Sequence, residues 1–132
     1  MDKLKVGFIC VHNSCRSQMA EAIAKFKYSD IMDVYSAGTD ISRPINIDAI
    51  RIIKEIYSID MTDNQKPKLI SNVPDLDVVI TMGCDVQCPI VKNQYTEDWD
   101  LNDPTNLPDV KYIETINAIE NKLSKLVKKL GL

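Results

Sequence analysis

Short apolar runs alternate along the chain with stretches whose apolar residues recur every three or four positions. The runs are short and contain β-branched residues, which is typical of buried strands. We therefore expect four strands, at residues 4–10, 33–37, 77–82 and 93–98. The periodic stretches predict helices with one buried face, at residues 16–26, 45–57 and 112–130, with a shorter helix at 67–72. Because strands that alternate with helices pair in parallel, the sequence predicts an α/β three-layer sandwich around a four-stranded parallel sheet.

The composition fits one soluble domain over residues 1–132. Apolar residues make up 45% of the chain, enough to bury a single core. The net charge is −3 and neither half carries a basic block, which argues against binding to nucleic acid or to a membrane surface. No stretch approaches the roughly 20 apolar residues of a spanning helix, and the first residues lack a signal-peptide pattern. We expect a cytoplasmic monomer that holds no metal or other cofactor.

Reactive side chains gather where the first strand gives way to the first helix. Residues 10–16 read CVHNSCR, so Cys10 ends the strand and Arg16 begins the helix. Backbone N–H groups of such a loop can turn inward around an oxyanion, and a guanidinium matches two of its oxygens. The same field favours a thiolate, because thiols at helix N-termini titrate about 1 to 5 units below the free value near 8.5. The pattern predicts a nucleophile aimed at the central atom of an oxyanion.

The residues between and beside these two are expected to complete the oxyanion site. The predicted binding residues are Val11, His12, Asn13, Ser14, Cys15, Arg16 and Ser17. Asn13 can adopt the left-handed conformation that the loop needs, and the hydroxyl groups of Ser14 and Ser17 can donate to the thiolate. Cys15 is expected to pack inside the loop, and His12 to be a loop side chain rather than a base. The structural alternative is a pair of small buried thiols beside a solvated arginine.

A second pair of cysteines follows the third predicted strand. Cys84 and Cys88 lie just after Gly83, which gives the backbone room to turn. Both pairs therefore fall beyond the carboxyl ends of strands, where ligands bind in parallel sheets. In a cytoplasmic protein, cysteines indicate catalysis, redox exchange or metal binding more often than structural disulfides. Two further thiols near an oxyanion site favour reduction of the anion over simple hydrolysis, and two buried apolar thiols are the alternative.

The sequence CVHNSCRSQMAE resembles the phosphate-binding loop of the low-molecular-weight tyrosine phosphatase superfamily. Its part NSCRSQMAE is closer still to the thioredoxin-coupled arsenate reductases that share that fold, and the similarity continues through YSAG and DP further along the chain. The resemblance implies that Cys10 attacks bound arsenate and that Asp103, oriented by the following proline, protonates the leaving oxygen. It further implies that Cys84 and Cys88 carry a disulfide outward and that thioredoxin reduces it.

Three features depart from the family pattern. His12 stands where the family usually has glycine, which is costly if that position needs a positive φ. Only three residues separate Cys84 from Cys88, whereas the better-known arsenate reductases of this fold have six between these cysteines. Some relatives bind a monovalent cation through residues matching Asn13, Glu21 and Ser36. Their further acidic ligand falls near Lys68 here, so that cation site is not carried over.

Three other functions remain open at this point. A tyrosine phosphatase is the first, although such enzymes usually carry aromatic residues directly after the Asp-Pro pair, where this chain has Thr105 and Asn106. Trp99 lies upstream and is expected to pack in the core. A structural zinc site is the second, since four cysteines suffice for one, but Arg16 would then place a cation beside a cation. A redox sensor without turnover is the third.

Overall fold

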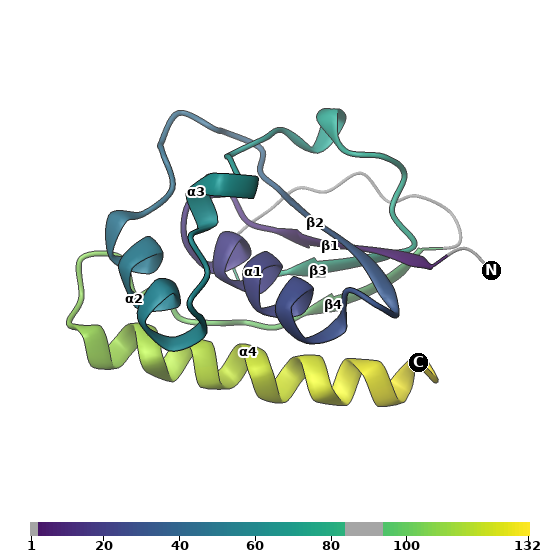
Figure 1. The fold of residues 1–132 in the computed structure, drawn as a ribbon. Coiled ribbons are helices and arrows are strands. Elements are labelled where there is room, and N and C mark those ends of the chain that lie inside the picture. The colour runs from purple at the N-terminus through teal and green to yellow at the C-terminus, as the bar shows by residue number, and fades with distance from the viewer. Residues whose placement is uncertain (1–2, 84–93) are drawn as a thin grey trace.

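A four-stranded parallel sheet forms the centre of the computed structural model, which describes residues 3–83 and 94–132 (Figure 1). The strands are β1 (Leu4–Ile9), β2 (Met32–Ala37), β3 (Val78–Thr81) and β4 (Tyr95–Asp98), in the order β2-β1-β3-β4. Ile9 pairs with Ala37 on one side and with Thr81 on the other, so neighbouring strands end together at one edge of the sheet. The predicted fold class is confirmed.

The three long helices form close to their predicted positions. They are α1 (Arg16–Tyr28), α2 (Ile47–Tyr57) and α4 (Asp109–Lys129). The Asn46 side chain accepts a hydrogen bond from Ala49 N and caps the start of α2. Gly131 follows α4 with φ +69° and donates its N–H to Lys128 O, which is typical of a glycine that caps a helix C-terminus.

The short helices differ from the prediction. Segment 67–72 forms only a 3-10 turn, η1 (Ile70–Asn72). The backbone of Lys68 is engaged elsewhere, since its N–H donates to the Asn13 side chain and its carbonyl accepts from Gly38 N. A four-residue helix, α3 (Met61–Asn64), was not predicted, because one turn is too short to show a period.

The core lies mainly between one face of the sheet and the helices. Val78 and Ile80 point into this main core, whereas Val79 joins a smaller cluster on the other face with residues of the η1 segment. Strand β3 is thus buried on both faces, as its sequence predicts. Trp99 is buried, with its ring centroid 5.5 Å from that of Phe8, so its predicted packing role is confirmed.

The buried faces that the sequence predicted for these helices include three apolar residues that are exposed in the structure. They are Phe26, Ile56 and Ile113. Phe26 instead packs edge-on against Tyr57 across the surface of α1 and α2, and Tyr112 is fully buried beside Ile113. Within the described ranges, no helix has the length and apolar character needed to span a membrane.

Candidate active site

The loop between β1 and α1 forms the floor of a small cavity at the carboxyl edge of the sheet. Cys10 directly follows β1, and its backbone N donates to Ala37 O (3.2 Å). The cavity has a volume of about 250 Å³. Its described lining consists of Cys10, Val11, His12, Ser14, Cys15, Arg16, Arg43 and Asp103. The structure therefore brings most of the predicted loop residues and Asp103 to one place.

Hydrogen bonds on the outer side of the loop set the direction of its amides. The carbonyl groups of Val11, Asn13 and Ser14 all accept from groups outside the loop. Their donors are the N–H groups of Thr39 and Asp40 (both 2.9 Å), the Gln18 side-chain amide (3.0 Å) and the N–H of Asn46 (2.7 Å). In a trans peptide the C=O and N–H groups point in opposite directions. The N–H groups that follow, of residues 12, 14 and 15, therefore point to the opposite side, which is the arrangement that binds an anion.

Gly38 allows β2 to lie close against this loop. A Cβ atom at this position would stand 2.6 Å from Val11 O and 3.0 Å from Cys10 O. These neighbours are backbone atoms, which cannot swing aside as a flexible side chain does. The glycine of the YSAG sequence is thus required by the close approach of two backbones.

Arg16 is buried, and its nitrogen atoms differ in their hydrogen bonds. Its Nη1 donates to Met82 O and to Leu101 O, each at 2.7 Å. Its Nε is also buried, yet among the described residues no acceptor meets it. Buried N–H groups are nearly always paired, and Nε and Nη2 form the edge of the guanidinium that binds two oxygens at once. Arg16 is therefore anchored through one nitrogen and has a donor edge left for a ligand.

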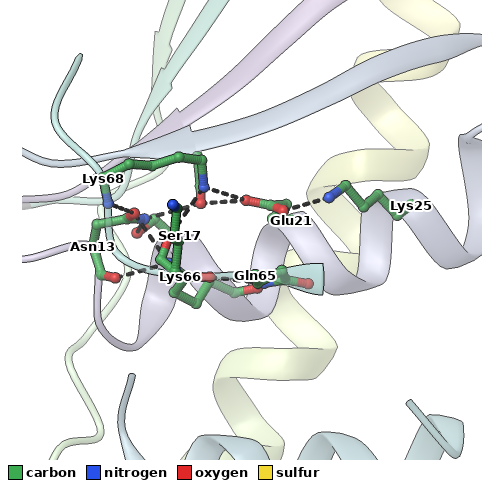
Figure 2. Close-up of polar contacts among 9 residues, drawn as sticks. Asn13, Ser17, Glu21, Lys25, Gln65, Lys66 and Lys68 are labelled. Atoms are coloured by element: carbon green, nitrogen blue, oxygen red, sulfur yellow. Dashed lines mark hydrogen bonds and ion pairs between the residues drawn. The ribbon is translucent and has the colours of Figure 1, made fainter. Parts of the chain in front are cut away.

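Asn13 is the residue that gives the loop its shape, and polar contacts surround it (Figure 2). It has φ +51°, in the left-handed region that the sequence predicted for it. Its Nδ2 donates to Ser17 Oγ (2.8 Å) and Ser36 Oγ (2.9 Å). Its Oδ1 accepts from Lys68 N and Gln18 Nε2, each at 3.0 Å. The strained backbone is thus held by contacts at both ends of a buried side chain.

The Asp103 carboxyl lies on the open side of the cavity. Its Oδ1 accepts from the N–H (3.1 Å) and the hydroxyl group (2.6 Å) of Thr105, which fixes its orientation after the Asp-Pro turn. Its Oδ2 lies 3.9 Å from Arg16 Nη2, and the side chain is 49% exposed. Asp103 is therefore positioned beside Nη2 of Arg16 while it keeps access to water.

Cys15 and His12 take structural positions in the loop. Cys15 is 3% exposed, and burial is the main cause that raises the pKa of its thiol to about 12. A thiol of this kind stays protonated and unreactive at neutral pH. The His12 ring nitrogen Nδ1 lies 3.1 Å from Asp40 O. His12 is absent from the described residues with positive φ, so its replacement of a glycine introduces no left-handed strain.

One residue of the cavity lining, Arg43, was not predicted from the sequence, and two predicted site residues lie outside the described part of the chain. Arg43 lines the cavity from the loop after β2, and nothing in its own sequence neighbourhood marks it as a site residue. Cys84 and Cys88 lie outside the described residues. Gly83, directly before them, has φ +89°, and a Cβ there would lie 2.7 Å from Asp100 Cα. The backbone at Gly83 therefore has a conformation and a close neighbour that favour glycine.

A family model and several known proteins are similar to this chain. The family model described as low molecular weight phosphotyrosine protein phosphatase matches residues 5–131. "Arsenate reductase 2" of Staphylococcus haemolyticus is 41% identical over 112 residues, which is 82% of this chain and 84% of that protein.

Solved structures agree with this relationship. A structure described as an arsenate reductase in the phosphate binding state has a TM-score of 0.83 at 34% identity, covering 96% of this chain and 98% of that one. A thioredoxin-dependent arsenate reductase of Corynebacterium glutamicum has a TM-score of 0.78 at 31% identity, covering 98% of this chain and 62% of that one. The chain belongs to the low molecular weight phosphotyrosine protein phosphatase family.

Proposed function

We propose that the protein is an arsenate reductase that binds arsenate in the loop of residues 10–17 and reduces it to arsenite through Cys10. The observation that carries this proposal is the buried edge of Arg16, whose Nε meets no acceptor in the described part of the chain. Arg16 lines the same cavity as Cys10 and four other residues of the loop. A tetrahedral dianion would pair with that edge and with the inward N–H groups.

The first chemical step forms a bond between sulfur and arsenic. The Cys10 thiolate supplies its electron pair to arsenic(V), and an As–O bond breaks. Asp103 gives its proton to the departing oxygen, which leaves as water. Asp103 lines the same cavity as Cys10, so its carboxyl group lies where it can reach the departing oxygen. The hydroxyl group of Ser17, whose oxygen already accepts from Asn13, has its proton left to donate to the thiolate before the attack.

The second step passes two electrons to arsenic. The Cys84 thiolate attacks the sulfur of Cys10, a disulfide forms between them, and the pair of electrons of the S–As bond leaves with arsenic as arsenite. Cys88 then attacks Cys84, which releases the Cys10 thiolate and moves the disulfide to Cys84–Cys88. A dithiol reductant restores both thiols by exchange. Each turnover thus consumes one arsenate and two reducing equivalents and produces arsenite and water.

Thioredoxin is the reductant that we propose. The support is similarity, since the Corynebacterium glutamicum neighbour is described as thioredoxin-dependent. Glutathione with a glutaredoxin is the alternative reductant system. Arsenate-dependent oxidation of NADPH by each complete reductant system separates the two.

Phosphomonoester hydrolysis is the second candidate function, because the chain belongs to a family described by its phosphatases. A phosphate in the same cradle would form a phosphocysteine on Cys10, which water then hydrolyses. The cavity favours a small inorganic anion over phosphotyrosine. Its volume is about 250 Å³, and its described lining includes no phenylalanine, tyrosine or tryptophan to stack on a substrate ring.

The test compares three serine variants in arsenate-dependent NADPH oxidation with thioredoxin and thioredoxin reductase. Cys10→Ser, Cys84→Ser and Cys88→Ser should each abolish repeated turnover. Cys88→Ser should still complete one round and accumulate a Cys10–Cys84 disulfide, which peptide mass mapping detects. Cys15→Ala is the matched control, since its thiol takes no part in the proposed relay. Loss of turnover in Cys10→Ser alone, with phosphomonoester hydrolysis intact in the other variants, would establish the phosphatase instead.

A further inference from the structure

A buried carboxylate beneath the loop is held between two lysines (Figure 2). Glu21 on α1 is 2% exposed. Its Oε2 pairs with Lys25 Nζ at 2.5 Å, and its Oε1 pairs with Lys68 Nζ at 3.3 Å. The same Oε1 accepts from Ser36 Oγ at 2.5 Å. One buried negative charge is therefore already matched by two ammonium groups.

These contacts do not fit the monovalent cation that some relatives bind through the matching residues. A metal ion beside Glu21 would be a third positive charge on one carboxylate. The Asn13 side chain turns its nitrogen to Ser36 and has its oxygen engaged by Lys68 N and Gln18. Lys68 Nζ also donates to Lys66 O at 3.2 Å. The ammonium of Lys68 thus has two acceptors of its own and directly contacts the carboxylate that a cation would need.

We propose that Lys68 is a resident cation that positions the oxyanion loop through Glu21, so that this protein needs no bound monovalent metal ion. The inference rests on the proposed function, because it concerns how the same loop is held ready for its anion. Lys68 is not among the described residues that line the cavity. Its effect must therefore pass through a chain of buried side chains.

Hydrogen bonds of fixed direction link Glu21 to Ser17 and so connect Lys68 to the loop. A carboxylate only accepts, so the Ser36 hydroxyl group must donate to Glu21. The oxygen of Ser36 then accepts from Asn13 Nδ2, and the other proton of this amide goes to Ser17 Oγ. Ser17 in turn keeps its own proton for a further acceptor, which the proposed mechanism identifies as the thiolate of Cys10. Lys68 balances the carboxylate charge at the start of this chain.

Lys25 provides a matched control on the same carboxylate. It is also a lysine, it pairs with the other oxygen of Glu21, and it lies four residues further along α1. Ser36 and Lys68 contact Oε1, whereas Lys25 bonds to Oε2 and, among the described residues, makes no hydrogen bond to Asn13, Ser17 or Ser36. Loss of Lys25 removes one charge near Glu21 but leaves the contacts of Oε1 in place.

The experiment measures phosphate binding by titration calorimetry on the reduced full-length protein, with Lys68→Met, Lys68→Arg and Lys25→Met beside the wild type. Phosphate is added as its Tris salt, and potassium chloride is compared with choline chloride at equal ionic strength. We expect Lys68→Met to weaken phosphate binding roughly 2- to 30-fold, the range for side chains that act through a packed network. Lys68→Arg should stay near wild type, since it keeps the charge, and Lys25→Met should bind as wild type does.

The dependence of phosphate affinity on potassium distinguishes a lysine that replaces a cation from one with only a structural role. Wild-type affinity and melting temperature should be equal in the two salts, and potassium should restore part of the lost affinity in Lys68→Met. Equal phosphate binding by Lys68→Met and the wild type overturns the inference, as does wild-type binding that strengthens in potassium. Equal weakening in Lys25→Met also overturns it. A wild-type protein that binds no phosphate in either salt overturns the proposed function itself.

Discussion

Replacement of Arg16 by lysine separates the charge of this residue from its geometry. In the structure Nη1 binds two backbone carbonyls at 2.7 Å, while Nε is buried without an acceptor among the described residues. A lysine ammonium has all its donors on one atom. It is therefore unable to hold Met82 O and Leu101 O and also present two parallel donors to an anion.

The expected loss follows from the bonds removed. A hydrogen bond to a charged group contributes about 1.5–3 kcal/mol. The loss of one such bond to the anion corresponds to roughly 10- to 150-fold weaker phosphate binding. The buried carbonyls of residues 82 and 101 also lose at least one donor, at a cost of about 1–3 kcal/mol in stability. Arg16→Lys should thus bind phosphate poorly and unfold at a lower temperature, even though its charge is unchanged.

Titration calorimetry with phosphate, with circular dichroism to follow the fold, measures both effects. Arg51→Lys is the matched control, because Arg51 also makes a two-nitrogen pair, with the exposed carboxylate of Asp109. A surface pair of this kind contributes little, so the control should keep wild-type phosphate affinity. If folded Arg16→Lys binds phosphate within about threefold of wild type, the guanidinium edge does not bind the anion and the reasoning fails.

Two further predictions concern the shape and the charge state of the loop. Gly38→Ala places a methyl group 2.6 Å from Val11 O. We therefore expect the free energy of unfolding in urea to fall by about 1–3 kcal/mol and phosphate binding to weaken. If neither value changes, the close backbone contact is contradicted. Burial raises the pKa of Cys15 from 9.0 to about 12, so the unfolded chain loses this proton near pH 9 while the folded one keeps it. The contribution of this thiol to stability should therefore be complete below pH 9 and fall by about 1.4 kcal/mol per pH unit between pH 9 and about 12. Cys15→Ala should remove this fall, and parallel stability curves for the two proteins would show that the thiol is not buried as described.

The elements that the sequence predicted well are those whose signal is local. Strand β3 carries apolar residues on both faces, and both faces are buried. Asn13 was expected in the left-handed conformation because a short polar side chain tolerates it, and it has φ +51°. The prediction that Cys10 and Arg16 share one loop required only two observations, the spacing of the two residues and a strand followed by a helix.

The parts that were missed depend on contacts between distant segments. Phe26 follows the period of α1, yet it is exposed, because periodicity shows the buried side of a helix and not how far its neighbours extend along it. The loop after β2 closes on the outer side of the oxyanion loop through Asn46 N and Ser14 O. Lys68 reaches Glu21 across 47 residues. No pattern within either segment indicates which partner it meets.

The site draws one contact from the end of every strand, which explains why this sheet edge suits the proposed chemistry. Strand β1 leads into Cys10, and β2 leads into Gly38 behind the loop. The carbonyls after β3 and β4, of Met82 and Leu101, both bind Arg16. Met82 N also donates to Ile9 O, so this residue is held on both sides. The described chain therefore enters the segment that carries Cys84 from a residue fixed against Arg16.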